Sequence, residues 1–345
     1  MEYRKLVKFG AATYCVSLPK NWVREHKLSK GDVLSIEAKD DGSLKVHSKE
    51  TAPHSRLKEI TIDISNMGIE EIRRRVLVAY INDFSVITLR GNIEGQVKAL
   101  REIFQQFVAL EVLELTDERI TAKAFIDASE TNPLKVMRRI DLLTRTMFGE
   151  VAECACNPSK MCFLEEKDLE VTRLHFFALK LITRGLGDTE TAHHWGFTKI
   201  ELAFIMSLAN EMERIADRLK RLSKSACAAS FGEAERQLMQ SHFVRADANY
   251  REAMTAFYKN DTTLAHRVID EHEANLKALD TKTFRCLSSQ RVRLGCGIPM
   301  VLEFLARIST LTEDIARIVL DLHPLDGADE AAAPKRTLIV MEDGK

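Results

Sequence analysis

The first 49 residues carry short stretches in which hydrophobic and more polar positions alternate. Tyr14, Val16 and Leu18 follow the two-residue period of a β-strand, and Pro19 ends the stretch. The features predicted after it are a short helix over 20–28, a turn over 29–32, and two strands joined by a hairpin turn at 40–42. Four short strands and one helical turn make a unit too small to be stable alone, so we expect it to pair with a second copy.

Residues 58–127 switch repeatedly between the hydrophobic periods of strand and helix. The predicted order is strand, helix, strand, helix, strand, strand. This order fits a small α/β sandwich with its helices on one face of a sheet. No catalytic constellation falls within it, and we interpret the charged positions of its helices as a solvated face. Residues 50–57 before it are predicted to be a linker.

From about residue 130 the hydrophobic period is that of a helix throughout. The predicted helices cover 131–155, 164–186, 197–228, 233–259, 261–290 and 298–323. The clearest apolar seam has spacings of four and three and consists of Phe204, Leu208, Met212, Ile215, Leu219 and Leu222. Six long helices in two groups of three favour a tandem pair of three-helix bundles.

These patterns predict an α+β multidomain protein, in which a small β head and a small α/β sandwich precede all-α bundles. The predicted domains are a head over 1–50, an α/β domain over 58–128, a first bundle over 130–230, a second bundle over 231–324, and a loose tail over 325–345.

The distribution of charge singles out the N-terminal unit. The chain has 50 Lys and Arg against 51 Asp and Glu, yet residues 1–31 alone carry a net charge of +5. Binding to a polyanion depends on where charge lies rather than on its total, so this composition allows DNA as a partner. The candidate DNA-binding residues are Arg4, Lys5, Lys8, Thr13, Lys20 and Arg24.

The chain lacks the sequence motifs that mark several classes of enzyme. The chain has no Walker A loop, no HExxH and no GxSxG, so we expect it not to be an enzyme. No apolar run reaches the roughly 18 residues of a membrane span, so we expect no membrane insertion and a cytoplasmic location. The seven cysteines form no CxxC pair and are interpreted as reduced thiols, with a metal role for Cys154, Cys156 and Cys162 as the lesser alternative.

Paired carboxylates on the predicted helix over 197–228 are the main metal candidate. Glu213 and Asp217 are four residues apart, on the face opposite the apolar seam, and carboxylates at this spacing can share a cation. Arg221 lies one turn further and can neutralise Asp217 instead. We therefore favour a salt-bridged surface ladder over a metal site. The weaker metal candidates are His193, His194, His266, Asp270 and Glu273.

The N-terminal unit resembles the SpoVT/AbrB-type domain. The resemblance rests on the segments KFG, VSLPKNW, LSKGDVL and DDGSLKV, and it covers about 45 residues. It implies an intertwined homodimer in which each chain supplies a swapped hairpin, and DNA binding by basic residues of the N-terminal strand and loops.

Residues 130–323 resemble the PhoU family, whose members are tandem three-helix bundles with an ExxxDxxxN signature on the third helix of each repeat. The first repeat reads ERIADRLKR, which keeps Glu213 and Asp217 and has Arg221 at the Asn position. The second has Asp314 at the Asn position and replaces both acids, with Ala306 and Thr310. The resemblance implies a divalent or iron ion on these helical faces, and no other cofactor is expected.

The two resemblances together are typical of archaeal-type phosphate uptake regulators. They imply a DNA-binding transcriptional regulator of phosphate homeostasis, whose helical body relays signals to a phosphate-transport or signalling protein. The alternative is an adaptor that does not bind DNA, dimerises through its head and docks on a transporter or kinase. A metalloenzyme is the weakest of the three classes. No phosphate-binding loop is present, so the sequence does not predict direct phosphate sensing.

Overall fold

The computed structural model describes residues 3–10, 13–38, 42, 44–47, 58–126, 131–156, 164–228, 233–288 and 297–323. The chain forms two compact units, residues 1–57 and 58–345, and each is described by itself. The predicted linker over 50–57 and the predicted tail over 325–345 lie outside the described residues.

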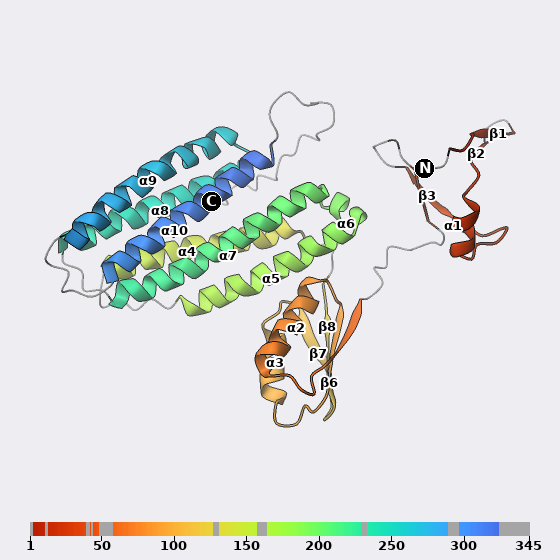
Figure 1. The fold of residues 1–345 in the computed structure, drawn as a ribbon, viewed down its shortest axis with the longest axis horizontal. Helices are drawn as coiled ribbons and strands as arrows, with labels where there is room; N and C mark the ends of the chain where they lie inside the picture. Colours follow the sequence, from red (N-terminus) through yellow and green to blue (C-terminus); the bar gives the residue numbers. More distant parts are fainter. Residues whose placement is uncertain are drawn as a thin grey trace, which may run out of the picture. The chain divides into compact units, whose positions relative to one another are not determined.

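The first unit contains two antiparallel hairpins and one short helix (Figure 1). Its elements are β1 (Val7–Phe9), β2 (Thr13–Cys15), α1 (Lys20–Glu25), β3 (Ser35–Ala38) and β4 (Leu44–His47). The four strands and one helical turn are as predicted. The strand predicted to reach Leu18 ends at Cys15, because β1 begins opposite that residue, at Val7. Gly31 has a φ of 99°, as the predicted turn requires.

The first unit has little core within one chain. Its hairpins form two separate two-stranded sheets, and no residue of α1 is buried. Phe9 is 74% exposed, and Tyr14 and Ile36 are each more than half exposed. Apolar side chains of this size are normally buried in a stable fold. The exposure agrees with the expectation that this unit needs a second copy.

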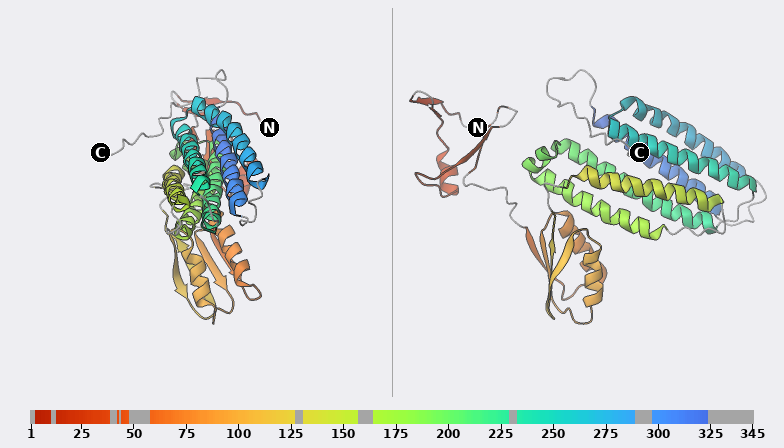
Figure 2. Two further views of the ribbon diagram at one scale, coloured as in Figure 1. Left: turned by 90° about the vertical axis from the view of Figure 1, so that its left-hand side faces the viewer. Right: turned by 180° about the vertical axis from the view of Figure 1, so that it is seen from behind.

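The second unit begins with the predicted α/β arrangement. Its elements are β5 (Glu59–Asp63), α2 (Ile69–Ile81), β6 (Val86–Arg90), α3 (Val97–Gln105), β7 (Leu110–Leu115) and β8 (Arg119–Ala124). The sheet order is β5-β6-β8-β7, with β5 and β6 parallel and the other neighbours antiparallel. Both helices cover one face of this sheet (Figure 2). The predicted order of elements is confirmed, and Ile72, Leu89 and Phe104 lie in the core.

The six long helices predicted beyond residue 130 are all found. Their bounds are α4 (Pro133–Cys156), α5 (Glu165–Gly187), α7 (Lys199–Ala228), α8 (Glu233–Lys259), α9 (Thr262–Ser288) and α10 (Gly297–Asp321). The connection predicted around His193 also contains a short helix, α6 (Thr189–His194). It begins after Asp188, whose carboxylate accepts hydrogen bonds from the backbone N–H groups of Glu190 and Thr191.

The long helices pack in two groups of three. Helices α4, α5 and α7 contact one another, as do α8, α9 and α10. The groups lie side by side, because α7 packs on α10 and α4 packs on α8 (Figures 1 and 2). The predicted seam of α7 is buried from Leu208 to Leu222, and Phe204 at its beginning is partly buried. The amphipathic period therefore predicted both the helix and the face that enters the core.

A buried lysine joins the α/β part of the second unit to its helices. Lys180 of α5 is fully buried, and its Nζ donates to the carbonyl oxygens of Tyr80 and Phe84 at 3.2 and 3.0 Å. The same Nζ lies 3.1 Å from a carboxylate oxygen of Asp83. Arg184 donates two further hydrogen bonds to Asp83, at 2.8 and 2.9 Å. These contacts satisfy carbonyls at the end of α2 and hold it against α5.

Candidate nucleic-acid interface

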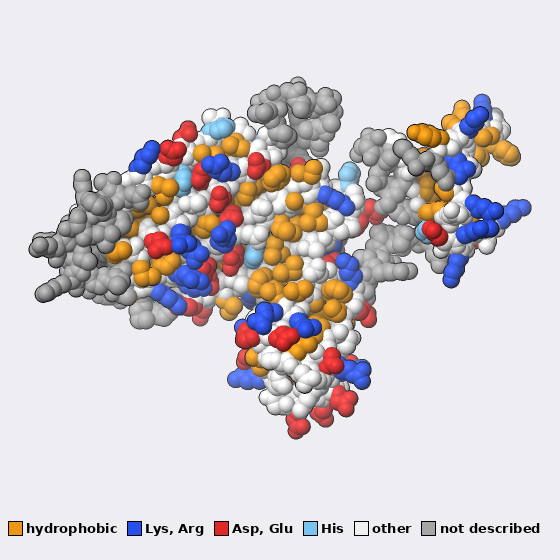
Figure 3. Space-filling model, viewed as in Figure 1, with side chains coloured by type: hydrophobic (Ala, Val, Ile, Leu, Met, Phe, Trp, Pro, Cys, Tyr) orange, Lys and Arg blue, Asp and Glu red, His pale blue; other side chains and the backbone are white. Residues whose placement is uncertain are grey.

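The predicted DNA-binding residues are all exposed in the first unit. Arg4 and Lys5 precede β1, and Lys8 lies on it. Lys20 and Arg24 are four residues apart in α1 and therefore share one face of that helix. Figure 3 shows basic side chains around both the β1–β2 hairpin and α1, with few acidic ones among them.

The β1–β2 hairpin separates two of the candidates. Lys8 pairs with Tyr14 across the hairpin, whereas Thr13 pairs with Phe9. Side chains of successive strand residues point to opposite faces, so Lys8 and Thr13 lie on opposite faces of the ribbon. The ribbon therefore presents Lys8 beside an aromatic ring on one face and Thr13 beside apolar side chains on the other.

An aromatic pair lies on α1 beside the basic residues. Trp22 is partly buried and stacks on His26, with ring centroids 4.6 Å apart. The Nδ1 of His26 lies 2.8 Å from the carbonyl oxygen of Trp22. The stacking holds the indole against its own helix, which fits a packing role better than stacking on a base.

One of the two candidate metal carboxylates of α7, that of Asp217, is paired with basic side chains. Asp217 is paired with the Arg221 Nε at 2.8 Å and the Lys220 Nζ at 3.2 Å. The same Nζ lies 2.6 Å from an oxygen of Asp168 on α5. Lys220 therefore lies between two carboxylates, as a metal ion would, and the predicted pairing of Asp217 with Arg221 is confirmed. No cluster of metal-ligating side chains occurs among the described residues.

The prediction of a salt-bridged surface ladder is wrong for Glu213. Its side chain is partly buried, on a helix that packs against α5 and whose Lys220 reaches Asp168 of α5. Burial raises the pKa of Glu213, and the nearby carboxylates of Asp217 and Asp168 raise it further. The helical period placed Glu213 opposite the seam, but it could not show the burial of its side chain.

Replacing Lys220 with Ala is expected to lower the free energy of unfolding by about 2 kcal/mol, between the values typical of exposed and buried pairs. The change leaves three carboxylates together without the ammonium that separates them. The loss should shrink as pH falls, because Glu213, whose pKa is raised, then becomes protonated and no longer repels its neighbours. Urea denaturation at pH 7 and pH 4.5 measures both effects.

Lys224→Ala is the matched control for this prediction. Lys224 lies on the same helix and pairs with Glu165 at 3.2 Å, but both side chains are more than half exposed. It should change stability little at either pH. Equal losses in the two variants would show that the Lys220 cluster contributes nothing beyond an ordinary surface pair.

The other metal candidates that the structure describes form no group that could hold a metal ion. In the second repeat Thr310 is exposed and donates to the carbonyl oxygen of Ala306, and Asp314 is partly buried. Burial raises the pKa of Asp314, as does the neighbouring carboxylate of Glu313. The remaining candidates, His193, His194, His266, Asp270 and Glu273, are exposed. The side chains of Cys154 and Cys156, and all of Cys162, lie outside the described residues.

The sequence analysis did not identify Asp168 and Lys220, the two residues that surround the carboxylates of Glu213 and Asp217 on α7. Asp168 is on a different helix from Glu213, and no periodicity relates positions so far apart in the chain. Lys220 follows Asp217 by three residues, so its helical spacing was a usable signal.

In the described part of the chain no helix combines the length and the apolar character that a membrane span requires.

A comparison with known protein families finds a match in the first unit. Residues 8–54 match the family model described as antidote-toxin recognition MazE, bacterial antitoxin. This match supports an AbrB-like N-terminal domain, as the resemblance of the sequence implied. It does not extend to the helices, so their resemblance to PhoU stays a prediction. No curated protein and no solved structure matches the chain.

Proposed function

We propose that the protein is a DNA-binding transcriptional regulator that acts as a homodimer through its first unit. The observation that carries this proposal is that the first unit exposes large apolar side chains and basic side chains together. Pairing two copies buries the apolar surface and brings about twice the +5 charge of residues 1–31 together. The match of residues 8–54 to an antitoxin family supports a regulatory role.

The basic side chains suit contacts with DNA phosphates. Lys and Arg displace the cations condensed on duplex DNA, and an Arg can also donate two hydrogen bonds to a guanine edge. We assign Arg4, Lys5 and Lys8 to one contact region, and Lys20 and Arg24 to a second on α1. Thr13 contributes a hydroxyl at the end of the hairpin.

We further propose that the regulator serves phosphate homeostasis, that it acts in the cytoplasm and that it is not an enzyme. The support is the resemblance of the helices to PhoU together with their packing as two groups of three. In this proposal the outer faces of the helices dock a phosphate-transport or signalling protein. Because Lys220 and Arg221 neutralise Asp217, the docking role does not depend on a metal ion at that position.

The description of the matched family favours a second candidate, an antitoxin-type regulator whose first unit recognises a toxin protein. In that case the exposed apolar side chains of the first unit bind a different protein, the toxin, instead of a second copy of this chain. The two candidates differ in the state of the purified protein, because only the leading proposal requires the chain alone to be a dimer that binds DNA.

Removing residues 1–57 is expected to abolish DNA binding. The second unit is compact without these residues, so the shortened chain should keep its helical circular dichroism and its cooperative unfolding. Fluorescence anisotropy with labelled duplex DNA, at several salt concentrations, compares the two chains. Equal binding by both chains would show that the second unit contacts DNA. Binding by neither chain would favour the alternative of an adaptor that does not bind DNA.

A further inference from the structure

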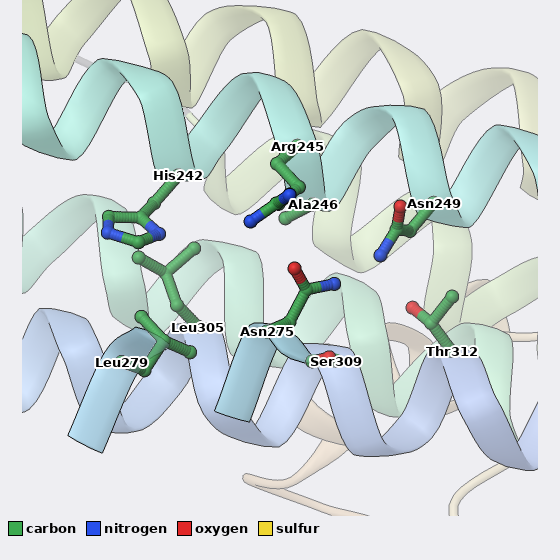
Figure 4. Close-up of a pocket in the computed structure, with 9 residues that line it drawn as sticks. All are labelled: His242, Arg245, Ala246, Asn249, Asn275, Leu279, Leu305, Ser309 and Thr312. Atoms are coloured by element: carbon green, nitrogen blue, oxygen red, sulfur yellow. The ribbon is translucent and has the colours of Figure 1, made fainter. Parts of the chain in front are cut away.

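A small polar cavity lies within the second group of helices, between α8, α9 and α10. Its volume is about 20 Å³, which is room for a water molecule or a small inorganic ion and excludes an organic metabolite. The polar residues that line it are His242, Arg245, Asn249, Asn275, Ser309 and Thr312. Figure 4 shows the guanidinium of Arg245 and the amides of Asn249 and Asn275 turned toward one space.

The lining selects an anion over a cation. No carboxylate is among the lining residues, and the charged side chain present is the guanidinium of Arg245. Arg245 is exposed, so it connects the cavity to solvent and supplies a positive charge there. The amide groups of Asn249 and Asn275 add donors from α8 and α9. Donors that converge from different helices suit an oxyanion.

One lining atom is placed to accept a hydrogen bond from the ligand. Asn275 is 7% exposed, and its Oδ1 has no hydrogen-bond partner among the described residues. A buried acceptor without a partner costs free energy, so a ligand that donates a proton there gains by satisfying it. Thr312 adds a second acceptor, because its hydroxyl already donates to the carbonyl oxygen of Ile308 at 2.8 Å.

The hydroxyl of Ser309 is held in place from α9. Its Oγ lies 2.9 Å from the Nδ1 of His272, and the Nε2 of that ring lies 3.1 Å from Glu313. Arg317 in turn contacts the other carboxylate oxygen of Glu313. This chain of contacts fixes a polar group at the wall of the cavity, and preorganised polar groups lower the cost of binding.

We propose that this cavity binds a small oxyanion that carries a proton, of the hydrogen phosphate class. The donors match the bare oxygens of such an ion, and the Oδ1 of Asn275 matches its hydroxyl. Sulfate has the same shape but carries no proton near neutral pH, so its oxygen lone pairs would face that acceptor. A role of the ion as effector rests on the proposed function, whereas its binding does not.

The test is calorimetric titration of the full chain at pH 7.5 with inorganic phosphate, sulfate and phenyl phosphate at equal ionic strength. We expect saturable binding of inorganic phosphate. Sulfate should bind about tenfold more weakly or worse, given the cost of facing an unsatisfied acceptor. Phenyl phosphate should bind more weakly than inorganic phosphate, because the cavity itself has no room for the phenyl ring. Equal binding of phosphate and sulfate, or binding of none of them, would overturn the proposal.

Two variants tie the binding to the cavity. Asn275→Leu removes the unsatisfied acceptor and keeps the volume, so the protein should fold while losing phosphate binding. Arg245→Gln should weaken binding about tenfold or more by removing the charge. Arg251→Gln is the control, because Arg251 lies on the same helix and pairs with Asp247 at 2.8 Å, outside the cavity. Phosphate binding that survives Asn275→Leu would overturn the assignment.

The outcome is separable from the proposed function. If the chain binds DNA and shows no phosphate binding, the cavity assignment fails and the regulator survives. If phosphate binds as expected and DNA does not, the cavity assignment survives and the regulator fails. DNA titrations with and without saturating phosphate then measure whether the ion acts as effector.

Discussion

Replacing Asp83 with Asn is expected to lower the free energy of unfolding by about 3–5 kcal/mol, the range found when one partner of a buried ion pair is removed. Lys180 is fully buried, and in the described structure its Nζ contacts Asp83, two backbone carbonyls and the face of the Tyr80 ring. Without the carboxylate its charge stays buried and uncompensated. Asn keeps the size of Asp and accepts the left-handed backbone at this position, where φ is 63°. Urea denaturation followed by circular dichroism measures the loss.

The double variant Asp83→Asn/Lys180→Met separates the ion pair from other effects of the substitution. Met removes the buried charge, so the double variant should be more stable than Asp83→Asn alone, although Tyr80 and Phe84 lose a donor. A cycle that also includes Lys180→Met gives the coupling energy between the two side chains. Losses that simply add would show that the pair contributes nothing as a pair.

The same pair predicts a pH dependence. Burial raises the pKa of Asp83, but the hydrogen bond with Arg184 and the charge of Lys180 outweigh burial and hold that pKa below its ordinary value. A carboxyl with a lowered pKa in the folded state stabilises the fold above its unfolded pKa of about 3.9. That stabilisation disappears as pH falls through the folded pKa. The difference between the native protein and Asp83→Asn should therefore narrow below about pH 4.

The order of strands and helices was predictable because hydrophobic period is a local property. The helices of the second unit follow their apolar positions closely, and the seam of α7 is buried as its spacing indicates. The predicted βαβαββ order is also correct, since β6 and β8 alternate as expected for strands with one covered face. In the first unit the alternation at Val16 and Leu18 predicted too long a strand. The strand ends at Cys15, because its partner β1 begins opposite that residue.

The polar contacts between helices were not predictable. Lys180 and Asp83 lie almost a hundred residues apart, and the sequence around each gives no sign of the other. The cavity is lined from three helices, so no local motif encodes it. Side-chain pairing of this kind depends on which helix faces meet, which the hydrophobic period leaves open.

The candidate DNA-binding residues were predictable as a group and not as a surface. Their charge is visible in composition, because basic residues outnumber acidic ones over residues 1–31. Their grouping depends on the hairpin register, which places Lys8 and Thr13 on opposite faces. Local alternation alone does not give that register.

Reversing two charges in the first unit, as Arg4→Glu/Lys8→Glu, is expected to abolish DNA binding at physiological salt. Each copy changes from two attractive side chains to two that repel phosphate, and a dimer doubles the change. Both residues are exposed, so folding should not depend on their charge. Lys98→Glu/Arg101→Glu is the matched control, because it makes the same charge change at exposed positions of α3 in the second unit.

The salt dependence of DNA binding by the full chain and these two variants tests the central claim most directly. The native chain and the α3 control should show a steep decline in the logarithm of affinity with the logarithm of salt, at a slope of about −0.9 per phosphate contact. Arg4→Glu/Lys8→Glu should not bind measurably in this salt range. Equal slopes and affinities for all three chains would contradict the claim that the first unit contacts DNA.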